Sequence, residues 1–254
     1  MMARLTAPPM LWAGGLLLLL VGLWRLDASP LRLVEGLGRL GWLLVLMVPP
    51  SSGGVLWELL EALLATLAMA FLGTFLAAVV SFPLAFLGAA NVMPVRLLRI
   101  GLRRSWDGLR GVDTLIWALV FVSAVGLGPF AGVLAIAVPD IGALSKLFSE
   151  AIEAADRRQA EAVRATGGTR LEAVRFGILP QVAPVLLSQV LYFFESNVRS
   201  ASILGIVGAG GIGLALSDRL RLNNWDEVAF IVLLILAMVA VIDTASRAIR
   251  RRLA

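Results

Sequence analysis

The long apolar runs of this chain constrain its fold more than any other feature. Several runs approach or exceed the ~20 apolar residues that an α-helix needs to cross a bilayer. They are continuous, whereas the strands of a membrane β-barrel would alternate. Hydrophobic residues make up 59% of the 254 residues and charged residues 15%, with a mean hydropathy of +0.92; soluble domains average about 25% charged. The sequence therefore predicts an all-α, polytopic membrane protein.

About six segments are long and apolar enough to be predicted as transmembrane helices. They are residues 10–24, 56–89, 113–125, 130–147, 181–204 and 227–242. The first run has no small-residue cleavage site, so we expect it to be a retained span. Residues 31–48 carry Arg32, Glu35 and Arg39 and precede a Pro/Ser/Gly segment, which favours an amphipathic helix at the interface. The alternative, a further crossing, would reverse the orientation of every later span.

Arginine is unevenly distributed over the predicted loops. One set of segments consists of the N-terminus, residues 91–111, residues 151–180 and the C-terminal tail. This set holds 15 arginines: Arg4, Arg96, Arg99, Arg103, Arg104, Arg110, Arg157, Arg158, Arg164, Arg170, Arg175, Arg247, Arg250, Arg251 and Arg252. The opposite set holds five: Arg25, Arg32, Arg39, Arg219 and Arg221. Because basic loops stay inside, both termini are predicted to be cytoplasmic.

Composition also excludes several functions. The net charge of +5 comes from residues that flank spans, so we expect a lipid bilayer as the partner and no nucleic acid. Cysteine and histidine are absent from the sequence, which excludes disulfides, thiolate metal sites and histidine metal sites. We expect no metal ion and no catalytic residue in this chain. It also lacks a Walker A sequence, so any ATP and Mg²⁺ must bind to another chain.

Residues 156–180 form the longest polar interruption and carry their own helix punctuation. Asp156 can cap a helix, and Gly167-Gly168 can end that helix in a left-handed turn. Thr169 and Glu172 have capping-box spacing, and Pro180 favours a stop just before it. The stretch is predicted to be two short helices joined at a glycine hinge. An ordinary solvated hairpin is the alternative.

The same stretch resembles the EAA loop of ABC importer permeases. The similarity lies in Glu161-Ala162-Val163-Arg164-Ala165-Thr166-Gly167, followed by Ile178-Leu179-Pro180. Val163 and Gly177 depart from the pattern, in which alanine and isoleucine are usual. In that family the first short helix docks on an ATPase subunit, which implies ATPase-coupling roles for Glu161, Ala162, Arg164, Ala165, Gly167 and Gly168. The small alanines fit a close approach of a partner.

The resemblance widens to the phosphonate-type branch of these permeases. Residues 117–133, 142–154 and 192–213 are similar to that branch, and the match covers about Leu56 to the end. It implies a type I, MetI-like permease domain at 56–254 with its coupling loop at 156–180. Residues 1–55 would form an extra N-terminal helix plus the interfacial segment. Val112-Asp113 replaces a usual Pro-Glu pair, and a histidine usual near Pro139-Asp140 is missing, so phosphite, phosphate and methionine stay open beside phosphonate.

Polar residues in the fifth predicted span are candidates for the translocation pathway. Glu195 and Arg199 lie four apart on one helix face, and charge within a span normally faces a bundle interior or cavity. The alternative is a structural ion pair. Tyr192 and Asn197 belong to the same branch-specific segment. Gly208, Gly210 and Gly211 match a dinucleotide fingerprint by letter but follow a membrane helix, so we expect a broken helix at an external gate or a plain turn.

Together these features predict a permease subunit of an ATP-driven importer in a bacterial inner membrane. The expected partners are a second copy of the chain, two ATP-binding subunits and an extracytoplasmic substrate-binding protein. A homodimer is expected because the sequence contains one EAA-like loop, although a paralogue could replace the second copy. The alternative from another class is an ion-coupled carrier or a channel, which would need coupling carboxylates in its spans and usually an inverted repeat.

Overall fold

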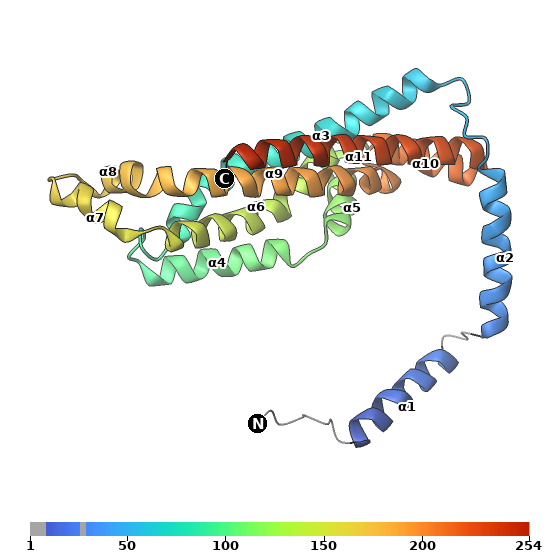
Figure 1. Ribbon diagram of the computed structural model, residues 1–254, viewed down its shortest axis with the longest axis horizontal. Helices are drawn as coiled ribbons and strands as arrows, with labels where there is room; N and C mark the ends of the chain where they lie inside the picture. Colours follow the sequence, from blue (N-terminus) through green and yellow to red (C-terminus); the bar gives the residue numbers. More distant parts are fainter. Residues whose placement is uncertain (1–8, 26–28, 254) are drawn as a thin grey trace. The chain divides into compact units, whose positions relative to one another are not determined.

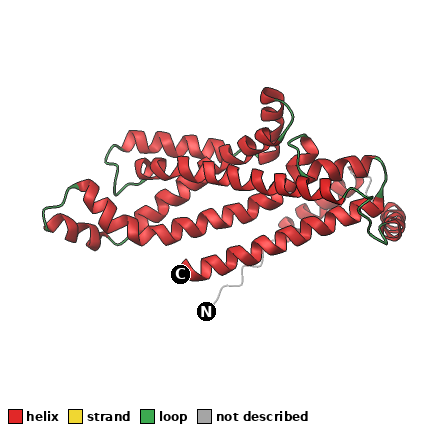
Figure 2. Ribbon diagram, turned by 90° about the horizontal axis from the view of Figure 1, so that it is seen from above, coloured by secondary structure: helices red, strands yellow, loops and turns green. Residues whose placement is uncertain are grey.

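The structure is a computed structural model, and it describes residues 9–25 and 29–253. Every secondary-structure element in these residues is a helix, which confirms the all-α prediction (Figure 2). The chain separates into two compact units, the first ending at Pro49 and the second beginning at Pro50. The break falls within the Pro/Ser/Gly segment that precedes Leu56.

The first unit contains two helices, α1 (Pro9–Arg25) and α2 (Pro30–Leu46). The side chain of Ser29 caps α2 by accepting a hydrogen bond from the backbone N–H of Arg32 at 3.3 Å. The predicted span 10–24 lies on α1 and the predicted amphipathic segment lies on α2. That α2 rests at the membrane interface stays a prediction.

The second unit is a bundle of long helices with a short-helix loop at one end. Its elements are α3 (Leu56–Gly88), α4 (Arg96–Arg110), α5 (Thr114–Val125), α6 (Pro129–Ala154), α7 (Arg157–Ala165), α8 (Arg170–Glu172), η1 (Ala173–Ile178), α9 (Leu179–Leu204), η2 (Gly205–Val207), α10 (Ile212–Arg221) and α11 (Trp225–Leu253). In Figure 1, α3, α6, α9 and α11 run alongside one another. The short helices α7 and α8 lie at one end of the bundle and α10 lies at the other.

Four helices among the described residues are long and apolar enough to cross a membrane. They are Leu56–Gly88, Pro129–Ala154, the continuous helix Arg170–Val207, and Trp225–Arg252. A fifth span exists if α4 and α5, which meet at a bend of 85°, are counted as one. Helix α1 adds a shorter apolar segment. All six predicted spans therefore lie on helices.

The third predicted span, 113–125, differs from the others because its helix is short. Helix α5 has 12 residues and so a length of about 18 Å, whereas the hydrocarbon core is about 30 Å thick. The preceding residues 91–111, predicted as an arginine-rich loop, contain the whole of α4. Trp106 of α4 is buried, and a Cβ on Gly88 would lie 2.2 Å from its ring. Helix α4 is therefore part of the packed bundle.

Ion pairs explain why so basic a helix can pack against α6. Lys146 of α6 contacts Asp107 Oδ1 of α4 at 2.9 Å. Arg103 contacts Glu153 Oε1 at 2.6 Å. These pairs cross between helices that are separated by dozens of residues, so the sequence pattern alone did not predict them.

Small residues allow the central helices α3 and α6 to approach closely. A Cβ on Gly73 would lie 2.7 Å from a methyl carbon of Ile136, and a Cβ on Gly132 would lie 2.7 Å from the sulfur of Met69. Ala70 and Ala135 are completely buried beside them. Close backbone approach through small residues is the usual way that membrane helices associate. The α3–α6 contact is therefore the centre of the bundle.

The predicted stop before Pro180 is wrong. Elements α8, η1 and α9 form one continuous helix, in which Leu179 has helical dihedrals (φ −55°, ψ −42°). The N–H of Leu179 donates to the carbonyl of Val174, five residues earlier, which is the wider turn of a π-helix. Pro180 follows this π-helical turn directly, so the continuous helix accommodates the proline beside a local widening. The second arm of the loop is therefore the beginning of the fifth predicted span.

Candidate functional site

The candidate coupling loop begins with a helix cap that is tied to the base of α9. The carboxylate of Asp156 accepts a hydrogen bond from the N–H of Arg158 at 3.0 Å, as the sequence predicted. The side-chain amide of Gln181 accepts from the N–H of Asp156 at 3.0 Å and donates to its carbonyl at 3.1 Å. The start of α7 is therefore held by the first turns of α9.

Helix α7 packs against η1 through one glycine. A Cβ on Gly177 would lie 2.6 Å from the Cα of Ala160, so the two backbones are in direct contact. This contact gives a structural reason for glycine at a position where related loops usually carry isoleucine. The opposite face of α7 exposes Glu161, Ala162 and Ala165. That face offers small side chains and one carboxylate to a partner, beside the exposed Arg158.

The glycine hinge is a Schellman motif, which ends α7 in a defined direction. Gly167 has φ +89°, in the left-handed region that favours glycine. Its N–H donates to the carbonyl of Arg164 at 3.1 Å, and the N–H of Gly168 donates to that of Val163 at 3.1 Å. A Cβ on Gly168 would lie 2.7 Å from the Val163 carbonyl oxygen. The predicted left-handed end of the helix is confirmed.

A capping box opens the second arm, also as predicted. The N–H of Thr169 donates to Glu172 Oε2 at 2.7 Å, and the N–H of Glu172 donates to Thr169 Oγ1 at 3.3 Å. Both arms of the loop are thus fixed by local hydrogen bonds on either side of Gly167-Gly168.

The charged candidates of α9 pair with α11. Arg199 Nη1 lies 3.4 Å from Asp243 Oδ1 and 3.9 Å from Glu195 Oε1. Glu195 Oε2 is held by Arg250 Nη2 at 2.8 Å. These contacts match the ion-pair alternative, while 47% of the Arg199 side chain is still exposed and accessible to a ligand. Tyr192, one helical turn before Glu195, is exposed as well.

Asn197 lies in a different environment, among three helices of the bundle. Its side-chain N–H groups donate to Thr74 Oγ1 of α3 at 2.8 Å and to Asp140 Oδ2 of α6 at 2.5 Å. All three residues are buried. Sequence reasoning grouped Asn197 with Glu195 and Arg199 and did not link it to Thr74. The available signal was Asp140, a carboxyl within an apolar helix, which requires a hydrogen-bond donor from elsewhere.

The glycine-rich segment breaks the helix at the far end of α9. Gly208, Gly210 and Gly211 all have positive φ, and α10 begins just after them. The Thr66 hydroxyl of α3 accepts a hydrogen bond from the N–H of Ile212 at 2.8 Å. A Cβ on Gly211 would lie 2.4 Å from that hydroxyl oxygen. The broken helix, one of two alternatives left by the sequence, is therefore present as a tightly packed joint.

Comparisons with known proteins agree with this architecture. Residues 81–254, more than half of the chain, match the family described as "Binding-protein-dependent transport system inner membrane component". A chain of the MetNI methionine ABC transporter, solved in inward-facing conformations, has a TM-score of 0.70 and 22% sequence identity. The match covers 80% of this chain and 100% of that one, and it shows the MetI-like fold.

Two curated relatives are similar over most of this chain. A phosphite transport system permease protein of Stutzerimonas stutzeri is 40% identical over 227 residues, which are 89% of this chain and 81% of the relative. A phosphate-import permease protein of Mycolicibacterium smegmatis is 39% identical over 232 residues, which are 91% of this chain and 43% of that longer relative. The chain therefore belongs to the family of inner-membrane components of binding-protein-dependent transport systems, as a transport subunit.

Proposed function

We propose that this chain is the permease subunit of an ATP-driven ABC importer for a small phosphorus oxyanion. The observation that carries the proposal is the loop at 156–180. Its first helix exposes Glu161, Ala162 and Ala165, and it is held to α9 by Gln181 and to η1 by the Gly177 contact. Such a loop can receive a push from a partner and pass it to a membrane helix.

In the proposed mechanism two ATPase subunits bind ATP and Mg²⁺ and dock on the α7 helices of two permease copies. Closure of the ATPase pair would shift α7. Helix α9 would follow, because Gln181 at its base is hydrogen-bonded to the backbone of Asp156 at the start of α7. The cavity between the copies would then switch from inward to outward facing. This chain would bind no cofactor itself. An extracytoplasmic binding protein would deliver the substrate, as the family description implies.

The second permease copy is proposed to be an identical chain. A single coupling loop per chain requires two chains for two ATPases, and a closed pair is the commonest symmetry. Sequential affinity purification of two differently tagged copies tests this proposal, because only a complex that contains two copies of this chain carries both tags. Recovery of only mixed complexes with a paralogue would contradict it.

The proposed orientation places α7, both termini and the basic tail in the cytoplasm of a bacterium. The arginine bias supports this orientation, and the bundle agrees in placing the α7–α8 loop at the end opposite α10. Accessibility of single cysteines introduced at Ala162 and at the exposed Leu222, just after α10, to an impermeant thiol reagent tests it. The Ala162→Cys protein should react only after cells are opened.

The substrate class follows from the relatives together with the sequence resemblance. The matched relatives are named for phosphite and phosphate transport, and the residues of the fifth span resemble the phosphonate branch. Calorimetry of the cognate binding protein with methylphosphonate, phosphite, phosphate and methionine would rank these ligands. Uptake by the permease alone, without an ATPase, would instead support a carrier or channel.

Glu161→Lys is expected to lower ATP-dependent uptake by about 30-fold or more. Reversing an interface charge costs about 2 kcal/mol or more of binding free energy. Within residues 9–25 and 29–253 Glu161 forms no ion pair, so the substitution breaks no internal salt bridge there. Uptake and ATPase co-purification should be measured in proteoliposomes. Glu150→Lys, at an exposed position on the neighbouring end of α6, is the matched control and should keep both. Normal uptake by the Glu161→Lys protein would refute the docking role.

Arg199→Gln is expected to raise the substrate concentration needed for half-maximal uptake by about tenfold, the effect of losing one charge-assisted contact. The complex should still assemble, because the Arg250–Glu195 pair remains. Arg250→Gln is the matched variant on the other side of the network. If both variants lower thermal stability equally and neither changes the half-saturation concentration, the four charges form a structural lock only.

A further inference from the structure

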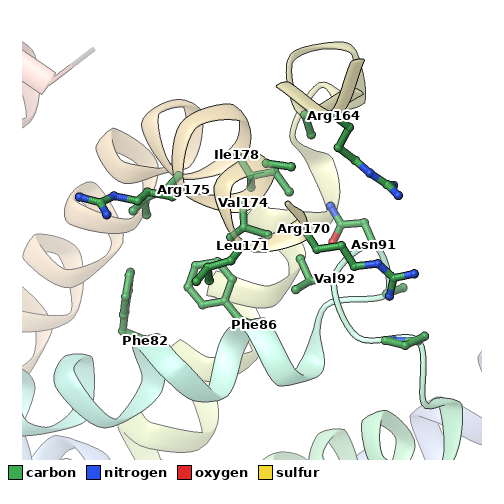
Figure 3. Close-up of a pocket in the computed structure, with 15 residues that line it drawn as sticks. Phe82, Phe86, Asn91, Val92, Arg164, Arg170, Leu171, Val174, Arg175 and Ile178 are labelled. Atoms are coloured by element: carbon green, nitrogen blue, oxygen red, sulfur yellow. The ribbon is translucent and has the colours of Figure 1, made fainter. Parts of the chain in front are cut away.

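A cavity of about 810 Å³ lies between the end of α3, the turn at 90–94 and the two arms of the coupling loop. Its walls are mainly apolar. They include Phe82, Phe86, Val92, Leu171, Val174 and Ile178 (Figure 3). Leu171 and Phe176, both on the second arm of the loop, are 77% and 59% exposed. The cavity therefore combines an apolar floor with an opening to the surroundings.

Three arginines lie around this apolar floor. Figure 3 shows the guanidinium groups of Arg164 and Arg170 on one side of the cavity, near Asn91, with Arg175 on the opposite side. None of the three has an acidic partner within the described part of the chain. Arg175 packs over the ring of Phe176 at 5.3 Å. Two adjacent, uncompensated guanidinium groups favour an anionic group, and phosphate in particular.

We propose that this cavity binds an anionic phospholipid of the inner leaflet. Arg164 and Arg170 would hold the headgroup phosphate, and the upper part of an acyl chain would lie along Phe82, Phe86 and Val174. A free phosphate would occupy only a small part of 810 Å³ and would leave the aromatic walls in water. A lipid can occupy both parts of the cavity, because its phosphate would contact the arginines while its acyl chain covers the apolar walls.

The position in the fold supports a lipid. The cavity lies where α3 ends and where the apolar helix Arg170–Val207 begins. Under the orientation proposed above, on which this inference rests, that level is the cytoplasmic headgroup region, where basic residues attract anionic lipids. The exposed apolar side chains of Leu171 and Phe176 are also consistent with a position at the membrane surface, where they would contact lipid.

A lipid in this cavity would connect the two arms of the coupling loop. Arg164 lies on α7, before the Gly167-Gly168 hinge, and Arg170 lies on α8, after it. One phosphate held by both guanidinium groups would restrict the angle between the arms. Anionic lipid would thereby strengthen the transfer of motion from α7 to α9.

The test uses the assembled transporter in nanodiscs that contain phosphatidylcholine with a minor fraction of phosphatidylglycerol. Lipids retained after mild detergent extraction are counted by mass spectrometry. We expect retention of phosphatidylglycerol over phosphatidylcholine. Arg170→Gln should lower that preference about fivefold, the usual effect of one basic residue near an anionic surface.

Two further variants make the test independent of any single arginine. Leu171→Glu keeps every arginine but places an acid beside them, and it should lower retention as much as Arg170→Gln does. Arg251→Gln, which removes an exposed arginine of the tail, should leave retention unchanged. Equal retention of both lipids by the unmodified complex would overturn the proposal.

Other occupants give distinct results. Inhibition of lipid retention by equimolar glycerol phosphate would indicate a soluble-anion site and would overturn the lipid assignment. Retention by the permease alone that disappears on ATPase assembly would show that the ATPase fills the cavity, with the same consequence. Because these measurements use no transport substrate, an error in the proposed substrate would not change their outcome.

Discussion

Gly177→Val is expected to reduce ATP-dependent uptake by about 10- to 100-fold, within the range of known coupling energies. The new Cβ would lie 2.6 Å from the Cα and 2.8 Å from the N of Ala160. Both are backbone atoms, so α7 must move away from η1 to make room. ATP hydrolysis by the assembled complex should persist while uptake is lost. Both rates should be measured on the same proteoliposomes.

Two other glycines provide controls for this prediction. Gly101→Ala lies on α4 with no atom within 4 Å of the new Cβ, and it should leave uptake unchanged. Gly167→Asn should retain most uptake, because asparagine tolerates the left-handed conformation of the hinge, whereas Gly167→Val should not. If Gly177→Val transports as well as Gly101→Ala, the packing of α7 on η1 does not transmit the ATPase movement.

The sequence predicted those parts of the loop that depend on neighbouring residues. The Asp156 cap, the left-handed turn at Gly167 and the Thr169–Glu172 capping box each involve residues at most five apart, and each is present. The stop before Pro180 failed because that rule describes only the local clash. A π-helical turn, supported by the packing of Gly177 on α7, carries the helix past the proline.

Contacts between distant helices could be anticipated only in part. The charge bias and the apolar runs indicated which segments are spans, but they did not reveal that α4 lies against α6 through Lys146 and Asp107. Lys146 is a charged residue within an apolar helix, and Asp107 is the acid of an arginine-rich helix in which Arg104 and Arg110 are its local ion-pair partners. Such residues signal that a partner exists, while only the fold determines which residue it is.

Asn197 illustrates the same limit with the largest expected effect on stability. Asn197→Leu is expected to lower the free energy of unfolding by about 2–3 kcal/mol, the cost of a buried polar group that loses its hydrogen bond. Within the described chain, Asn197 is the hydrogen-bond donor that Asp140 Oδ2 uses, at 2.5 Å. Thermal unfolding of the purified permease in lipid nanodiscs would measure the loss.

A double variant separates the hydrogen bond from side-chain packing. When Asp140→Leu is added to Asn197→Leu, most of the lost stability should return, because replacing both partners by apolar groups leaves little unsatisfied. Ser200→Ala, which removes only a bond of 3.4 Å to the Ser196 carbonyl within α9, should change stability little. If the double variant is less stable than the single one, volume and not hydrogen bonding limits the site. Recovery would mean that the unsatisfied carboxyl of Asp140, and not the change in side-chain volume, accounts for the lower stability of the Asn197→Leu protein, so that this hydrogen bond joins α6 to α9.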